Sequence, residues 1–228
     1  MKSSISSLAA LLPKALLAVL PALLLSGVAS ASTLVVNCGT ISGPTEIVAG
    51  AVLCPQFNLA GQTLSDISIA VSGGISGSIT LTNGDNAPQT GSGTTTTSFN
   101  FGALSGFSFV NPIYSASFTS GVRSLSAGQT LTIAGLTGSG NGSLGNDTTV
   151  FGPYTGAGNF SIPVTTSTLF SSAGTGGFFF AAQSTNANAT AQVTYTYSAT
   201  QPVPEPATLS LLGVGLLGLA IRRFRIGK

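Results

Sequence analysis

Apolar and polar residues alternate in many short stretches of this chain, and no other feature limits its fold so strongly. In Leu64–Val71 (LSDISIAV) the apolar residues Ile67, Ile69 and Val71 stand two positions apart, so a strand would place them on one face. Further alternating stretches are Ser78–Thr82, Ser98–Phe101, Phe107–Phe109, Tyr114–Phe118, Thr130–Ile133, Phe160–Ile162 and Gln192–Tyr197. Their β-branched and aromatic residues, bounded by Gly, Asn and Pro, predict half-buried strands.

These strands predict an all-β domain over residues 32–200. Roughly nine to eleven short strands would form a β-sandwich or a jelly-roll-like pair of sheets, in an order that the pattern leaves open. Two low-complexity stretches, Gly91–Thr97 (GSGTTTT) and Gly138–Asp147 (GSGNGSLGND), are expected to be loops. The apolar run Phe178–Phe180 indicates either a strand buried on both faces or an exposed aromatic patch used for binding.

Charge is scarce, which excludes one class of partner. Charged residues make up 5% of the chain, against about 25% in ordinary soluble domains. Between residues 32 and 201 they are Arg123, Glu46, Asp66, Asp85 and Asp147. A nucleic-acid-binding protein needs clustered Lys and Arg to neutralise phosphates, so we expect no nucleic-acid partner.

The same composition offers little for catalysis. The chain has no His, and its four acids between residues 32 and 201 are far apart in the sequence. General acid–base and nucleophilic catalysis need such groups close together, so we expect no enzyme activity, no catalytic residue and no cofactor. Asp85 and Asp147 lie beside Asn and Gly, but neither stretch supplies enough oxygen ligands at regular spacing for calcium, so we expect no metal site.

The first 31 residues have the three parts of a secretory signal peptide. Lys2 and Lys14 supply positive charge, Ala15–Leu25 is apolar, and the small residues before Ser32 predict cleavage between Ala31 and Ser32. The alternative is an uncleaved anchor helix, which the shortness of the apolar stretch and its internal proline disfavour. Secretion machinery and signal peptidase are therefore expected partners.

Export bears on the two cysteines, Cys38 and Cys54. In an oxidising compartment such a pair usually forms a disulfide, which would contribute about 3 kcal/mol for a loop of this length. Two free buried thiols are the alternative. A redox or metal site is disfavoured, because no His or carboxylate cluster accompanies the pair.

Residues 201–228 combine three parts in order. Val203, Pro204, Glu205 and Pro206 come first, then fifteen uncharged residues, then Arg222, Arg223 and Arg225. Prolines keep the first part extended, and a transmembrane helix of fifteen residues would measure about 22 Å, short of a ~30 Å hydrocarbon core. The arginines should stop on the cytoplasmic side of the inner membrane. These residues alone leave open whether the segment is a permanent or a cleaved anchor.

This three-part arrangement resembles the PEP-CTERM sorting signal of Gram-negative bacteria. The resemblance covers about the last 25 residues and implies recognition by exosortase, a membrane enzyme that depends on a cysteine. Cleavage would occur near Pro204–Pro206, so the membrane anchor would be transient and the protein would then reach the cell surface or the extracellular space. Members of the family are exported proteins that are often linked to extracellular polysaccharide and biofilm.

The middle of the chain resembles the choice-of-anchor β domains that accompany such tails, type E most closely. The similar stretches are Phe57–Asn83, Tyr154–Val164 and Ala189–Ser198. We therefore expect a non-enzymatic protein of the cell surface or extracellular matrix. The alternative is a ligand-binding module for polysaccharide or, as a weaker candidate, ice, because Thr-x-Thr pairs occur without a fixed repeat.

Overall fold

The computed structural model describes residues 31–199 and 213–215. The chain divides into two units, Ala31–Ser198 and the two end segments Met1–Ser30 and Ala199–Lys228. In the end segments the structure describes Ala199 and the helical residues 213–215. The expected signal peptide up to residue 30, the Pro-Glu-Pro motif and Arg222, Arg223 and Arg225 lie outside the described residues.

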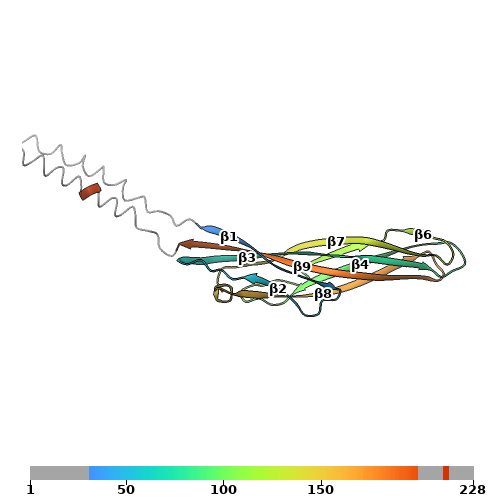
Figure 1. Cartoon of the computed structure of the whole chain (residues 1–228), viewed down its shortest axis with the longest axis horizontal. Coiled ribbons are helices and arrows are strands. Elements are labelled where there is room, and N and C mark those ends of the chain that lie inside the picture. Colours follow the sequence, from blue (N-terminus) through green and yellow to red (C-terminus); the bar gives the residue numbers. More distant parts are fainter. Residues whose placement is uncertain (1–30, 200–212, 216–228) are drawn as a thin grey trace, which may run out of the picture. The chain divides into compact units, whose positions relative to one another are not determined.

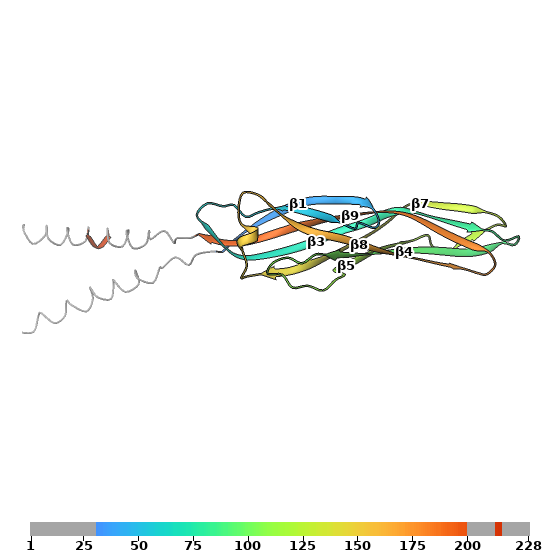
Figure 2. The same ribbon diagram turned by 90° about the horizontal axis from the view of Figure 1, so that it is seen from below.

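Residues 32–199 form nine strands and one short 3-10 helix, which confirms the all-β prediction (Figure 1). The elements are β1 Ser32–Pro44, β2 Gly50–Pro55, β3 Gln62–Asn83, β4 Gln89–Phe101, β5 Tyr114–Thr119, β6 Arg123–Leu125, β7 Thr130–Asp147, η2 Gly152–Tyr154, β8 Asn159–Gly174 and β9 Phe179–Ala199. One sheet has the order β1-β9-β3-β7, and the other has β2-β8-β4-β5, with β6 also pairing with β4. We call them sheet A and sheet B; Figure 2 shows them as two layers.

The strands are longer than the sequence predicts, and the β domain is elongated along them (Figure 1). The expected strands Leu64–Val71 and Ser78–Thr82 are two ends of one strand, β3, which has 22 residues. At about 3.3 Å per residue such a strand measures about 70 Å. Ser32 of β1 pairs with Tyr197 of β9, so the chain enters and leaves the domain at one end. We call that end the base and the opposite end the tip.

The stretch Gly138–Asp147 is part of strand β7, so the loop prediction for it was wrong. Its glycines bring β7, the edge strand of sheet A, close to β5 of sheet B. A Cβ atom at Gly138 would collide with the Ser117 carbonyl oxygen, and one at Gly140 would lie 2.8 Å from the Ser115 carbonyl oxygen. The glycines allow close backbone approach here, whereas the sequence pattern predicted a loop.

The stretch Gly91–Thr97 is also a strand, as part of β4, and that loop prediction was wrong as well. Thr95 and Thr97 are buried between the sheets, and Thr96 between them faces outward. A Cβ atom at Gly91 would overlap the ring of Phe179, so the glycine makes room for that ring. Low-complexity composition concealed an inward–outward alternation in which threonine and glycine take the inner positions.

Phe107–Phe109 does not form the expected strand, because the chain loops between β4 and β5. The Asn111 side chain takes the place of a strand partner for Phe101. Its amide group donates to the Phe101 carbonyl oxygen at 2.8 Å, and its carbonyl accepts from the Phe101 N–H at 2.9 Å. Phe107 packs edge-on against the Tyr154 ring, with ring centroids 5.7 Å apart. The alternation at this place reflects loop packing.

The run Phe178–Phe180 is not a strand buried on both faces, so that alternative was wrong. Strand β9 begins at Phe179, whose ring packs between the sheets against Gly91 and Gly174. Phe178 and Phe180 point to the other side and are 63% and 52% exposed. Neighbouring residues of a strand face opposite ways, so burying the middle ring exposes the other two.

The two open sides of the sandwich are closed in different ways. On one side, Cys38 of β1 and Cys54 of β2 form the expected disulfide, with a Cα–Cα distance of 4.3 Å. It joins the edge strand of sheet A to the edge strand of sheet B. On the other side, the β7 glycines pack against β5 without a covalent link. The core between these sides is apolar and aromatic toward the base and includes Ile67, Ile69 and Tyr195.

Candidate functional site

The four acidic residues of the β domain are held in separate local contacts. Glu46 accepts from the Thr168 N–H at 2.9 Å, and Asp66 accepts from the Asn146 side chain at 3.3 Å. Among residues 31–199 and 213–215, no three His, Cys, Asp or Glu residues lie close enough together to hold a metal ion. These contacts make Glu46 and Asp66 acceptors in local structure.

Asp147 organises the turn that follows β7. Burial alone would raise its pKa, but hydrogen bonds from the N–H groups of Thr149 and Val150 and from the Thr149 hydroxyl lower it below the ordinary value. The carboxylate also lies where a Cβ atom of Gly106 would be, which fits the positive φ of that glycine. Burial, with the nearby negative charge of Asp147, raises the pKa of Tyr154 to about 12. Asp147 therefore acts in local structure.

The outer face of sheet B carries a regular array of hydroxyl groups. The pairing of β5, β4 and β8 sets side chains in rows, which are Thr119–Thr94–Ser171, Ser117–Thr96–Leu169 and Ser115–Ser98–Ser167. Two of the β4–β5 neighbours are joined by hydroxyl–hydroxyl hydrogen bonds of 3.2 Å. Adjacent strands lie about 4.8 Å apart, and alternate residues of one strand about 6.7 Å apart. We call the eight serines and threonines of these rows the hydroxyl array; Leu169 takes the ninth position.

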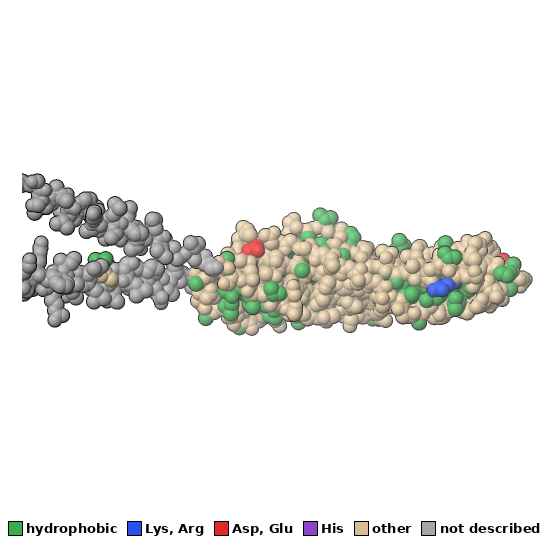
Figure 3. Space-filling model, turned by 90° about the horizontal axis from the view of Figure 1, so that it is seen from above, with side chains coloured by type: hydrophobic (Ala, Val, Ile, Leu, Met, Phe, Trp, Pro, Cys, Tyr) green, Lys and Arg blue, Asp and Glu red, His purple; other side chains and the backbone are tan. Residues whose placement is uncertain are grey.

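The space-filling view shows how little charge one face of the β domain carries. Figure 3 shows a face that is mostly uncharged, with scattered hydrophobic patches and few charged atoms. Such a surface can form hydrogen bonds with neutral hydroxyl-rich partners, and it offers little for electrostatic steering of a charged partner.

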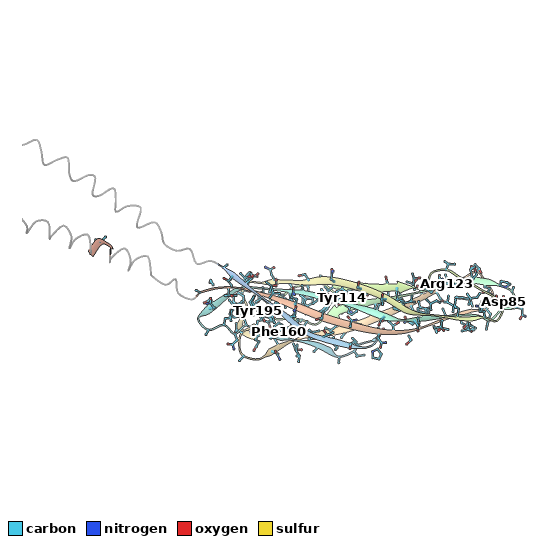
Figure 4. All side chains as sticks on the ribbon, turned by 45° about the horizontal axis from the view of Figure 1, so that its top comes forward. Asp85, Tyr114, Arg123, Phe160 and Tyr195 are labelled. Atoms are coloured by element: carbon cyan, nitrogen blue, oxygen red, sulfur yellow. A yellow bond between two sulfur atoms is a disulfide. The ribbon has the colours of Figure 1, made fainter. Side chains whose placement is uncertain are left out.

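The tip carries the largest exposed aromatic groups of the described chain. Phe178 and Phe180 contact each other edge to face, with ring centroids 4.7 Å apart and planes at 89°. The Phe178 carbonyl oxygen accepts from the Gly84 N–H at 2.7 Å, which joins the β8–β9 turn to the β3–β4 turn. Figure 4 places Asp85 and Arg123 at this end of the domain and Tyr195 and Phe160 toward the other.

Threonines lie beside these rings on the outer face of sheet A. β3 and β9 run antiparallel, because Ser65 bonds Thr196 near the base and Gly84 bonds Phe178 at the tip. Strands β3 and β9 are neighbours in sheet A, and continuing the antiparallel pairing two residues from the Gly84–Phe178 contact places Phe180 opposite Thr82. The Thr82 hydroxyl is 3.1 Å from that of Thr130 on β7. The next pair, Thr80 and Thr132, repeats this contact at 2.9 Å.

Sequence reasoning found some of these groups and missed others. The exposed aromatic patch was one of two alternatives for Phe178–Phe180, whereas the hydroxyl array was not foreseen. A signal was present, because Ser or Thr occupies every second position in Thr94–Ser98 and Ser115–Thr119. Recognising the array also requires the register between strands that are distant in sequence, which the alternation does not provide.

The sequence predicts signal cleavage at the start of the β domain and sorting residues after its end. Ala31 and Ser32 are described, and Ser32 begins strand β1. The motif Val203–Pro206 and the arginine cluster lie outside the described residues. In the described ranges, 31–199 and 213–215, no helix is long and apolar enough to cross a membrane.

The fold comparison gives only distant similarity. No curated protein matches the sequence. A chain of the infectious bursal disease virus T13 particle is 10% identical over 79% of this chain and 42% of its own length, with a TM-score of 0.20. A chain of the Gx strain of that virus is 9% identical over 83% and 51%, with a TM-score of 0.15. The chain spans about half or less of each viral chain, and TM-scores this low carry no argument.

The sequence comparison gives a specific result for the C-terminal segment. Residues 202–225 match the family described as the PEP-CTERM protein-sorting motif. The match contains the Pro-Glu-Pro residues, the apolar run and the arginines in the expected order. The similarity of the middle domain to choice-of-anchor type E stays a prediction. The chain therefore carries a PEP-CTERM protein-sorting motif, and this motif implies export, transit through the membrane and exosortase as the processing partner.

Proposed function

We propose that the β domain is a non-enzymatic protein of the cell surface or extracellular matrix, associated with the extracellular polysaccharide of a biofilm. After signal peptidase removes residues 1–31, exosortase would cleave near Pro204–Pro206 and release the domain from the inner membrane. The sorting motif at residues 202–225 is the observation that carries this proposal.

The surface of the β domain supports a role in a polysaccharide matrix. Polysaccharides present many hydroxyl groups, and the hydroxyl array offers serines and threonines that can each donate one hydrogen bond and accept two. Low charge suits a neutral environment. Asp66 and Asp147 lie at neighbouring positions of the paired strands β3 and β7, but each accepts hydrogen bonds from different groups. No His accompanies them in the chain, which favours a role without catalysis.

A second candidate function is a dedicated polysaccharide-binding module, favoured by the exposed rings of Phe178 and Phe180. Ice is the weaker ligand candidate, because the hydroxyl rows span three strands and Leu169 interrupts one of them.

Fractionation of the producing cells tests the main proposal. We expect the protein to co-purify with the extracellular polysaccharide and to leave that fraction when a glycosidase degrades the polymer. Tight association with the cell envelope in cells that make no polysaccharide would contradict it. Hydrolysis of the polymer by the purified protein, abolished by a single Glu46, Asp66, Asp85 or Asp147 substitution, would contradict the non-enzymatic role.

A further inference from the structure

We infer that the tip is a binding site for a neutral polysaccharide chain, formed by Phe178 and Phe180 with Thr82 and Thr130. The inference rests on the proposed function as a matrix protein, and it adds the site and the class of ligand. The rings come from the β8–β9 turn and the start of β9, whereas the threonines come from β3 and β7.

The exposed rings supply the apolar part of this site. Large aromatic side chains are usually buried, and an exposed group of them at one place indicates an interaction surface. The neighbouring Phe179 is half-buried and packs against the core, whereas Phe178 and Phe180 are left exposed. Because the Phe178 and Phe180 rings stand at 89° to each other, a sugar ring can stack its C–H face on one while contacting the edge of the other.

The threonines supply the polar part. Each hydroxyl has one donor and two acceptor positions, so the pair has two donors and four acceptors. The Thr82–Thr130 bond uses one donor and one acceptor. One donor and three acceptors therefore remain for the hydroxyls of a sugar. Aromatic stacking with nearby hydroxyl partners is the combination that a polysaccharide needs.

The charges near the tip favour a neutral ligand over a polyanion. The Asp85 carboxylate accepts from the Gln89 side chain at 3.0 Å and from the Asn86 N–H at 2.7 Å. Arg123 donates from Nε to the Ser120 carbonyl oxygen at 2.9 Å. A single arginine gives little attraction for an anionic polymer or a phosphate-rich surface.

The position of the site also fits such a role. The chain enters and leaves the domain at the base, where Ser32 pairs with Tyr197. The tip is the other end of the elongated domain (Figure 4). A site there is remote from the covalent connections to both end segments.

Retention of the exported protein on defined polymers tests the site. The probes are cellulose, dextran and galactomannan as neutral polysaccharides and alginate as a polyanion. We expect retention on at least one neutral polymer, and about tenfold or greater weakening in F178A/F180A. Replacement by tyrosine, F178Y/F180Y, should preserve retention. The matched control is V48A/V110A, which removes apolar side chains that are 81% and 86% exposed elsewhere and should bind like the wild type.

Several outcomes would overturn the inference. They are retention on alginate alone, no retention on any neutral polymer, and equal retention of wild type and F178A/F180A. Sedimentation supplies a further one, because a wild-type dimer that F178A/F180A converts to a monomer would make the tip a self-association surface. Thermal unfolding of each variant shows whether a loss of retention is merely a loss of folding.

The site and the proposed function can fail separately. Normal exosortase-dependent release of F178A/F180A, with lost glycan retention, supports the site. If the wild type is retained on glycans but is never released from the membrane, the site stands and the proposed function fails. If it is released but F178A/F180A binds like the wild type, the site fails and the proposed function stands.

Discussion

The base and the distal half of the β domain are packed with different materials. At the base, aromatic rings fill the space between the sheets, as in the contacts of Tyr154 with Phe160 at 4.9 Å and of Phe57 with Tyr195 at 5.5 Å. Toward the tip, threonine and glycine take many of the inner positions, and Thr95 and Thr97 are buried. The comparison separates an aromatic interior at the base from a mixed interior toward the tip, where buried Ile79 and Leu81 of β3 lie with the threonines and glycines.

The buried threonines are tolerated in this interior because their hydroxyl groups are paired. The Thr97 hydroxyl lies 2.9 Å from that of Thr168, and Thr95 donates to the Gln183 side chain, which also accepts from Thr185 at 3.1 Å. Burying an unpaired hydroxyl group would cost free energy, whereas a hydroxyl group that forms a hydrogen bond avoids most of that cost. Small inner residues also let the sheets approach closely, and phenylalanine fills the space over glycine.

The largest expected effect is at the base. Tyr195→Ala should lower the free energy of unfolding by about 3–5 kcal/mol, because it removes a fully buried ring. It also removes the hydrogen bond from its hydroxyl to the Pro55 carbonyl oxygen at 2.7 Å. Urea unfolding measures the loss, and Tyr195→Phe separates the hydrogen bond from the ring, at about 1 kcal/mol. A loss below 1 kcal/mol for the alanine variant would end the claim that rings dominate the base.

The disulfide should contribute the next largest effect. Cys38→Ser with Cys54→Ser should cost about 3 kcal/mol, because it frees the edge strands β1 and β2 in the unfolded chain. Reductant should destabilise the wild type by a similar amount and leave the double variant unchanged. Equal urea midpoints for wild type and double variant would mean that the β1–β2 side is closed without the covalent link.

In the distal half, the expected sensitivity is to added volume. Gly91→Ala should cost about 1–3 kcal/mol, because its Cβ atom would overlap the Phe179 ring. Gly43→Ala is a matched control in a strand, since nothing lies within 4 Å of its Cβ position. If the two variants unfold at the same urea concentration, the packing of Phe179 over Gly91 does not limit the size of the side chain at position 91.

A smaller effect is expected at the base, where the stability should depend on pH through Tyr154. Burial first, and Asp147 second, raise the pKa of Tyr154 to about 12 in the folded protein. Because an unfolded tyrosine titrates near pH 10, this contribution to stability is complete below about pH 10 and is lost as pH rises toward 12. Tyr154→Phe should therefore flatten part of the decline in urea midpoint between pH 10 and 12. Parallel decline of wild type and variant would exclude Tyr154 as its cause.

The sequence was sufficient for the parts of the fold that follow a local rule. Alternation in Leu64–Val71 predicts a strand because side chains on a strand face opposite ways, and the two cysteines predict a disulfide because export implies oxidation. At Gly91–Thr97 and Gly138–Asp147 the composition predicted loops, but both stretches are strands. There the glycines are explained by a neighbouring strand or ring, which lies far away in the sequence.

The candidate binding groups show the same division. The apolar run Phe178–Phe180 was visible, but its two exposed rings follow from Phe179 packing over Gly91 and Gly174. The partnership of Phe180 with Thr82 and Thr130 depends on the register of β3 with β9 and β7. Register between distant strands is set by the assembled core, so alternation along one strand cannot reveal it.

The most direct test of the account is the intact mass of the exported protein, measured in cells with and without exosortase. With the enzyme, we predict a chain that begins at Ser32, carries the disulfide and ends near Pro204–Pro206. Without it, the C-terminal segment should remain attached. A chain that keeps Arg222, Arg223 and Arg225 in both strains would contradict release by exosortase and would make the segment a permanent anchor.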